Sequence, residues 1–423
     1  MQNSFHREQV ADGIYFSHVA DSKFYSNCLS VSLIVPLAAE TVTDNAVVPP
    51  VLRLGCRTCP DFTALNRRLG LLYGATLSSD VMRFGAYQVL SVSAKGLDRR
   101  VALRGEDMVR ELCTLICDIV LDPLLLDGVF GKDQVELEQH NLMDTILSEI
   151  NDKRIYAQAQ CHSLMFGDSP RALRPYGTVE QAQKITPLSA YEAYCRMLKT
   201  AQIELMFVGS GDYETALEAF RERFSGISRE GVQKASPSVA ELSGPVKERT
   251  ETMEVNQSKL VMGFRCRPQD ERSVYDLRLM SAMYGGTPFS KLFLNVREKL
   301  SLCYYCSSRY DRSNGTLLVS SGVEKDKKQA AYEEILRQLQ ALRDGEFTDE
   351  DLQNTVLAMN TGFAATGDSL YALENWYLTQ ILFGQQHSPE EERTVMQTLT
   401  REEVVEAARG TELDSVYFLT TAD

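Results

Sequence analysis

The stretch Leu300-Ser-Leu-Cys-Tyr304 follows a helix-like segment and resembles Leu69-Gly-Leu-Leu-Tyr73, which lies 231 residues earlier. Each stretch is followed by a strand-like run of similar text. In the first half this run is Leu90-Ser-Val-Ser-Ala94, and in the second half it is Leu317-Leu-Val-Ser-Ser321. Because the order of the elements matches as well as the residues, we predict a duplicated α/β domain.

Apolar patterning extends this alternation along the whole chain. Short apolar runs rich in β-branched residues predict strands over residues 28–37, 89–94, 203–208, 258–264 and 317–321. Helical spacing predicts helices over 142–166, 213–224, 274–284 and 330–342. The patterns Thr348 to Asp351 and Thr400 to Glu403 look like capping boxes that each open a helix.

Between the two halves, Ser, Gly, Pro, Lys and Glu replace most of the apolar residues, which is typical of a linker. We therefore predict one domain over residues 1–228, a linker over 229–250 and a second domain over 251–423. A chain of 423 residues is long enough for this division and for a large core without a disulfide or metal.

Composition narrows the classes of function. The formal net charge of −14 argues against general binding to nucleic-acid phosphates or to anionic membrane surfaces. We find no membrane-spanning segment, since three aspartates interrupt the most apolar stretch, 112–130, and no signal peptide at the N-terminus. Ten cysteines without an export signal are typical of reduced thiols, so we expect a cytoplasmic protein.

Three motifs invite a metal or cofactor but are weak. Gly209-Ser-Gly211 lacks the third glycine of a dinucleotide loop and is typical of a tight turn, so we expect no cofactor. The five histidines include no pair at metal-binding helical spacing. Two Cys-x-x-Cys pairs have the spacing of zinc half-sites but are also consistent with buried core thiols. These pairs are Cys56 with Cys59 and Cys303 with Cys306.

Arg297 and Tyr304 form a further candidate pair. If a helix ends near Lys299 and a strand begins near Leu302, both side chains can point into one cleft. A guanidinium and a phenol hydroxyl both suit a peptide carbonyl. From spacing alone, a capping arginine and a core tyrosine explain the same residues.

Three stretches resemble the M16 (insulinase, pitrilysin and mitochondrial processing peptidase) family. The first is Pro175-Tyr-Gly177-Thr178-Val-Glu180, and the second runs from Tyr284-Gly285-Gly286 through Val296-Arg297-Glu298-Lys299 to Tyr304. The third is Leu399-Thr400-Arg-Glu-Glu403. Within the family, residues 151–157 resemble the insulinase-like bacterial proteins associated with 5-aminopentanol modification of elongation factor P.

This resemblance implies an α+β fold of two homologous domains, each a mostly antiparallel sheet with helices packed on one face. Two such chains would form a clamshell around an extended peptide. Active members carry His-x-x-Glu-His, but the matching positions here are Val47, Pro50 and Val51. The third zinc ligand would fall near Asp144 or Thr145, and two prolines are not expected inside the helix that presents the motif. We therefore predict no metal and no proteolysis by this chain alone.

The resemblance also implies a role for Arg297 and Tyr304, which match a family pair that holds substrate carbonyls. Our main hypothesis is a non-catalytic subunit that pairs with an active zinc peptidase paralogue and positions an extended peptide. The alternative is a homodimeric, non-enzymatic peptide-binding or scaffold protein linked to elongation factor P modification. A third hypothesis is a metal site at Cys56, Cys59, Cys303 and Cys306.

Overall fold

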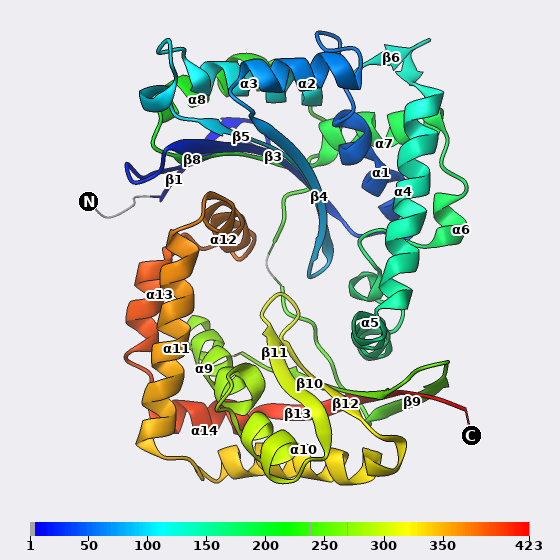
Figure 1. Ribbon diagram of the computed structural model, residues 1–423, viewed down its shortest axis with the longest axis vertical. Coiled ribbons are helices and arrows are strands. Elements are labelled where there is room, and N and C mark those ends of the chain that lie inside the picture. Colours follow the sequence, from blue (N-terminus) through cyan, green and yellow to red (C-terminus); the bar gives the residue numbers. More distant parts are fainter. Residues whose placement is uncertain (1–4, 237, 269, 423) are drawn as a thin grey trace. The chain divides into compact units, whose positions relative to one another are not determined.

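The computed structural model describes residues 5–236, 238–268 and 270–422, and Figure 1 shows its helices and strands. These residues form two compact units. Unit 1 combines the described residues up to Leu147 with 173–236 and 366–388. Unit 2 combines 148–172 with the described parts of 238–365 and 389–422. Each unit therefore includes one segment from the opposite half of the sequence.

Unit 1 is built around a six-stranded sheet. All neighbouring strands are antiparallel except β2 and β8, which are parallel. In spatial order the strands are β1 (Phe5–Ala11), β2 (Ile14–Ala20), β8 (Gln202–Gly209), β3 (Ser26–Pro36), β5 (Tyr87–Leu97) and β4 (Thr76–Phe84).

Alternate residues of β3 enter different hydrophobic clusters, because successive side chains of a strand point to opposite faces. Leu29, Val31 and Leu33 join the main core, whereas Cys28 and Ile34 are buried on the other face. The helices that contribute to the main core are α1 (Val42–Leu52), α2 (Phe62–Leu71), α3 (Met108–Leu121), α4 (Lys132–Asn151), α6 (Val179–Ala182), α7 (Pro187–Thr200) and α8 (Tyr213–Phe224). A two-residue hairpin joins β6 (Leu125–Leu126) to β7 (Val129–Phe130).

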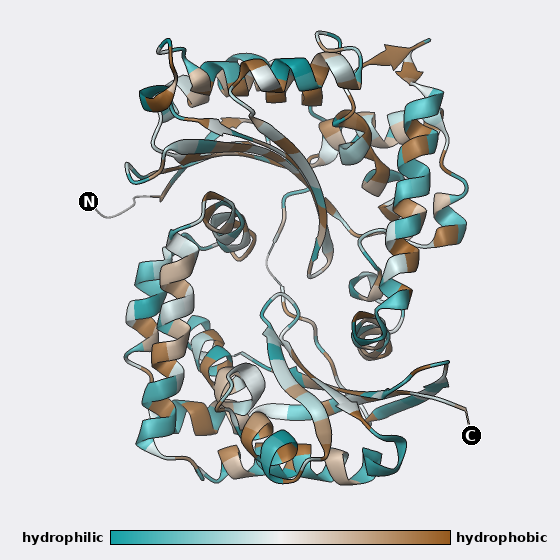
Figure 2. Ribbon diagram, in the orientation of Figure 1, coloured by the Kyte–Doolittle hydropathy of each residue, from teal (hydrophilic) through white to brown (hydrophobic). Residues whose placement is uncertain are grey.

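Unit 2 is built around a five-stranded sheet whose order repeats that of unit 1. In space its strands are β9 (Lys247–Thr252), β13 (Thr411–Thr420), β10 (Ser258–Cys266), β12 (Thr316–Val323) and β11 (Cys303–Asp311). Strands β9 and β13 are parallel, as are β2 and β8, and the other pairs are antiparallel. The sheets therefore match strand for strand, with β1 as the addition in unit 1. Figure 2 shows apolar residues along much of both sheets, whereas strand β9 is hydrophilic.

The helices of unit 2 include α9 (Glu271–Ser281), α10 (Lys328–Arg343), α11 (Asp349–Gly367), α13 (Pro389–Met396) and α14 (Arg401–Arg409). Two π-helical segments, η3 (Ala282–Gly286) and η4 (Leu292–Lys299), precede strand β11. The fully buried Tyr284 anchors η3 to α10, because its hydroxyl donates to the carbonyl of Ile335 at 2.7 Å. The segments η3 and η4 therefore fix the backbone that leads into strand β11 and Tyr304.

Helix α5 (Lys153–Phe166) comes from the first half of the sequence but packs on the sheet of unit 2 (Figure 1). Ala157 and Cys161 are fully buried in a cluster with residues of β10 and β13. Gly263 of β10 permits this close packing, since a Cβ there would lie 2.3 Å from the sulfur of Met165. At the helix C-terminus, the Lys247 ammonium donates to the carbonyls of Leu164 and Met165. This contact is stabilising because a positive charge lies at the negative end of the helix dipole.

Helix α12 (Leu370–Leu382) makes the reciprocal exchange. It lies on the face of the unit 1 sheet opposite α3 and α8 (Figure 1), where Leu373, Tyr377 and Leu378 share a cluster with Ile34 and Met206 of the sheet. In the described parts of the chain, each sheet therefore has helices on one face and an exchanged helix on the other.

The predicted fold class is confirmed: the chain is α+β with two mixed sheets, each packed with helices. All five predicted strands are present, and α8 has the predicted bounds. Both capping boxes are confirmed, because Thr348 bonds with Asp351 and Thr400 bonds with Glu403 in both directions.

The prediction of one helix over 142–166 is wrong, because α4 ends at Asn151 and α5 begins at Lys153. The side chain of Asp152 accepts from the backbone N–H groups of Arg154 at 2.9 Å and Ile155 at 3.1 Å, and so caps a new helix.

The exchanged segments mean that no single cut in the sequence separates the two units. Within the predicted linker, the Arg229 side chain donates to the carbonyls of Leu198 and Ala201 in unit 1. The last residues of that linker begin strand β9 of unit 2. Among the described residues, every helix is too short or too polar to cross a lipid bilayer.

Candidate functional site

Helix α1 carries the three positions that match the zinc motif. Val47 is fully buried and Val51 nearly so, and both belong to the main core of unit 1. Pro50 is partly exposed. Valine and proline side chains have no atom that can ligate a metal or accept a proton, so these positions contribute packing only.

The expectation that two prolines would exclude a helix is wrong, because α1 runs through Pro49 and Pro50. Both lie in its last turn, where only two backbone hydrogen bonds are lost and the helix ends directly afterwards. The backbone N–H of Arg53 still donates to the carbonyl of Pro49 at 3.2 Å. Asp144 and Thr145, the predicted positions for a third ligand, are exposed on α4.

Among residues 5–236, 238–268 and 270–422, no group of three or more His, Cys, Asp or Glu side chains is placed to hold a metal ion. Cys56 and Cys59 are buried in a tight turn of unit 1, where each backbone N–H donates to the carbonyl of the other. Cys303 and Cys306 are buried in unit 2. The structure therefore lends no support to the four-cysteine hypothesis.

The turn at Gly209 to Gly211 also has a structural role. The side-chain oxygen of Asn27 accepts from the backbone N–H groups of Ser210 at 3.0 Å and Gly211 at 2.8 Å. Asp212 then caps α8. Since these amides already have a protein partner, they are not available for a phosphate.

Arg297 lies on η4, where the buried residues Leu292 and Val296 fix the helix against unit 2. Its guanidinium lies 4.6 Å from the ring centroid of Phe293 and 3.5 Å from the carboxylate of Glu298. Its side chain is 41% exposed, so the guanidinium can still reach a ligand.

Tyr304 follows on β11, after a turn in which Ser301 has a φ of +47°. The helix therefore ends and the strand begins where the sequence predicts. Tyr304 is the extra residue of a β-bulge, because Cys303 pairs with Val323 while Tyr305 pairs with Gly322. The bulge leaves Tyr304 64% exposed at an edge strand, and its hydroxyl lies 3.4 Å from Glu324.

Segment η4 packs against strand β11, so Arg297 and Tyr304 lie on neighbouring elements. The pKa of the Cys303 thiol is lowered by hydrogen bonding with Cys306, and the positive charge of Arg297 lowers it further. Arg297 therefore acts on the residue directly before Tyr304. Their joint action on a peptide carbonyl stays a prediction.

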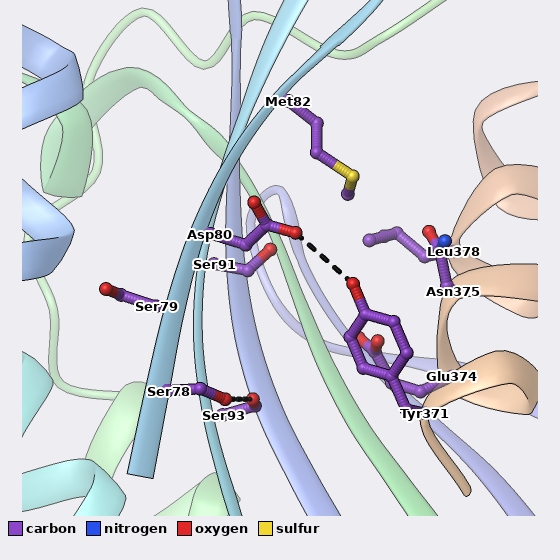
Figure 3. Close-up of a pocket in the computed structure, with 10 residues that line it drawn as sticks. All are labelled: Ser78, Ser79, Asp80, Met82, Ser91, Ser93, Tyr371, Glu374, Asn375 and Leu378. Atoms are coloured by element: carbon purple, nitrogen blue, oxygen red, sulfur yellow. Dashed lines mark hydrogen bonds between the residues drawn. The ribbon is translucent and has the colours of Figure 1, made fainter. Parts of the chain in front are cut away.

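A polar pocket in unit 1, not singled out from the sequence, lies between α12 and the edge of the sheet (Figure 3). Its volume is about 110 Å³. The lining residues are Ser78, Ser79, Asp80 and Met82 of β4, Ser91 and Ser93 of β5, and Tyr371, Glu374, Asn375 and Leu378 of α12.

The serines of this pocket form part of a polar patch on the sheet of unit 1. Ser91 and Ser93 pair across the strands with Ser32 and Ser30 of β3. Because the two serines of each strand are two residues apart, their side chains point to the same face of the sheet. The matching Ser-x-Ser spacing in the two strands is the signal from which sequence reasoning could have found this face.

Comparison with known proteins places the chain among peptidase-like folds. Residues 184–359 match the family model described as "Peptidase M16 inactive domain". The chain is similar to the Bacillus subtilis protein named "Probable inactive metalloprotease YmfF", with 27% identity over 402 residues that span 95% of this chain and 94% of that protein.

Two crystal structures share the fold along almost the whole length. A conserved protein from Enterococcus faecalis superposes with a TM-score of 0.90 at 24% identity, covering 99% of both chains. A peptidase M16 inactive domain from Pseudomonas fluorescens superposes with a TM-score of 0.79 at 14% identity, also covering 99% of both chains.

Proposed function

We propose that the chain is an inactive homologue of the M16 peptidases, as its similarity to that family suggests, and that it is the non-catalytic subunit of a two-chain peptidase. In this proposal an active zinc peptidase paralogue supplies the metal and the general base. The present chain binds an extended peptide and positions it for cleavage. Arg297 and Tyr304 are the proposed contacts with the peptide.

The observation that carries the proposal is the contrast between two regions of the chain. The helix that matches the zinc motif offers Val47, Pro50 and Val51, which have no ligand or base. By contrast, Arg297 and Tyr304 keep exposed hydrogen-bond donors on a well-packed scaffold. A guanidinium and a phenol hydroxyl can both donate to a peptide carbonyl.

The test is to mix the purified chain with an active His-x-x-Glu-His paralogue from the same genome and to measure cleavage of a peptide. We expect a one-to-one complex by native mass spectrometry, with activity that neither chain has alone. The double variant Arg297→Ala with Tyr304→Phe should lower kcat/KM about thirtyfold to a thousandfold, the range expected when one charged and one neutral hydrogen bond are lost.

Arg309→Ala is the matched control, since Arg309 is exposed on the same strand, β11, and has no hydrogen-bond or ion-pair partner among the described residues. It should leave the activity unchanged. If the double variant is as active as the control, Arg297 and Tyr304 have no positioning role.

The competing function is a homodimeric scaffold that binds a peptide without cutting it, as part of elongation factor P modification. A stable homodimer that does not bind the paralogue would favour this function over the two-chain peptidase. Capture of elongation factor P by the purified homodimer would then support the narrower link.

A further inference from the structure

The pocket beneath α12 has an unbalanced charge. None of its ten lining residues is basic, whereas Asp80 and Glu374 are acidic. The remaining polar groups are serine and tyrosine hydroxyls and the amide of Asn375. All of these can accept a hydrogen bond, so the lining is suited to a ligand that donates hydrogen bonds and carries positive charge.

Glu374 is the group that most needs such a ligand. Its side chain lies on the pocket wall, yet the residue is only 7% exposed. One carboxylate oxygen accepts a hydrogen bond from the Ser30 hydroxyl at 2.8 Å. Within the described parts of the chain, no group donates to the other oxygen, Oε2. A buried carboxylate with one unpaired oxygen is costly in free energy, and a cation in the pocket would remove that cost.

Asp80 is the second acceptor. Its Oδ1 atom accepts from the backbone N–H of Val81 at 2.8 Å, and its Oδ2 atom faces the Tyr371 hydroxyl at the long distance of 3.4 Å (Figure 3). Asp80 and Glu374 therefore each present a single oxygen to the pocket, from β4 and α12 respectively. Neither presents the pair of free oxygens that a guanidinium fork requires.

This geometry favours an ammonium group over the other common cations. An ammonium has three donors that point in separate directions, so it can bond to single oxygens on separate elements. A divalent metal ion is disfavoured, because the described residues contain no group of three candidate ligands. Met82 and Leu378 supply an apolar wall for an alkyl stem.

We propose that this pocket binds a primary alkylammonium group, with Glu374 and Asp80 as its acceptors. This inference does not rest on the proposed function. The ammonium can belong to a free alkylamine or to a lysine side chain, since the two have the same chemistry at the binding end.

The titration of Glu374 gives the proposal a pH dependence. The pKa of Glu374 is raised to about 7, chiefly by burial; the Ser30 hydroxyl opposes this shift, and the charge of Asp80 on β4 adds to it. The other titratable groups that interact with Glu374 are Tyr371 of α12 and Cys28 of β3. Because the cation binds the ionised carboxylate, affinity should be about tenfold higher at pH 8 than at pH 6.

The experiment is isothermal titration of the full chain with n-butylammonium chloride, with n-butanol as the neutral probe of similar shape. A second arm compares an N-acetylated, C-amidated peptide containing one lysine with the same peptide containing norleucine. We expect saturable binding of n-butylammonium and none of n-butanol. If the lysine peptide also binds, the ligand class includes protein side chains, and if it does not, the class is free amines.

Glu374→Gln removes the charge but keeps the shape, and should weaken n-butylammonium binding at least tenfold and abolish its pH dependence. Glu222→Gln is the matched control, because Glu222 is exposed on α8 of the same unit. Asp80→Asn, at a partly exposed site, serves as the second variant if Glu374→Gln does not fold, and it should also weaken binding. Absence of saturable binding at pH 8, equal binding of n-butanol, or unchanged binding by both variants would overturn the proposal.

Discussion

Replacing Glu374 with glutamine should change how the stability of unit 1 depends on pH. In the folded protein, burial raises the pKa of this carboxyl from 4.5 to about 7. The folded state therefore retains a proton that the unfolded chain releases above about pH 4.5. The stabilisation from this group is fully present below that pH and is lost as the pH rises through about 7.

The size of the effect follows from the two pKa values. At about 1.4 kcal/mol per pH unit, a rise from 4.5 to about 7 corresponds to about 3 kcal/mol of unfolding free energy between acid and alkaline conditions. Glutamine does not titrate, and its side chain can still accept a hydrogen bond from Ser30. Relative to the wild type, the variant should therefore gain about 3 kcal/mol in stability between pH 4 and pH 8.

Trp376 provides a local readout, since it is the only tryptophan in the sequence and lies on α12. Urea unfolding followed by its fluorescence, for wild type and Glu374→Gln at a series of pH values, reports the stability difference in unit 1. Titrations shared by both proteins cancel in the comparison. If the difference does not change with pH, Glu374 does not titrate as described.

Three further predictions concern packing and buried hydrogen bonds, each measured by urea unfolding. Leu373→Ala should destabilise the transition reported by Trp376 by about 2–5 kcal/mol, because Leu373 is almost fully buried between α12 and the sheet; a smaller effect would mean that α12 is loosely docked. Gly285→Ala should destabilise unit 2 by about 1–3 kcal/mol or more, because its Cβ would lie 2.6 Å from the backbone nitrogen of Ser308; wild-type stability would show that the backbone there can move. Arg171→Lys should lower the free energy of unfolding by about 1.5–3 kcal/mol, because a lysine cannot reproduce the 2.8 Å bonds to Asn314 and Ser238. Unfolding followed by far-UV circular dichroism measures this change, and an unchanged urea midpoint would contradict the prediction.

The predictions that came true rest on local rules. Strand β3 was predictable because an apolar, β-branched run of that length has few alternatives, and α14 because Thr400 and Glu403 are spaced to cap each other. The similarity of 300–304 to 69–73 correctly indicated duplication, since each stretch leads into the edge strand of its sheet.

The wrong predictions are those in which a local sequence rule was not sufficient, because the position of a residue within its helix also mattered. Residues 142–166 keep apolar spacing across the break, so the pattern hides the new start at Asp152, which is visible only as a cap. Prolines disrupt a helix interior, but Pro49 and Pro50 lie in the last turn of α1, where few backbone hydrogen bonds depend on them.

The pocket was missed because its parts are far apart in the sequence. The apolar residues Leu373, Tyr377 and Leu378 indicate that α12 is buried. They do not indicate which of the two sheets α12 packs against. Glu374 becomes notable only when Ser30 and Asp80 lie beside it, and residues 344 positions apart cannot be paired by periodicity. The same limit applies to any site built from exchanged segments.

The exchange of α5 and α12 has a consequence for how the protein is made. Strands β1 to β5 of unit 1 are translated long before α12, so unit 1 stays incomplete until residue 388 has been made. Helix α5, by contrast, is made long before β9, β10 and β13, the strands that it covers. During synthesis, an apolar sheet face in one unit and an apolar helix face in the other are therefore exposed to water until the segments that cover them have been translated. Residues far apart in the sequence must therefore be translated before either unit is complete, and the apolar surface exposed until then is of the kind that chaperones shield.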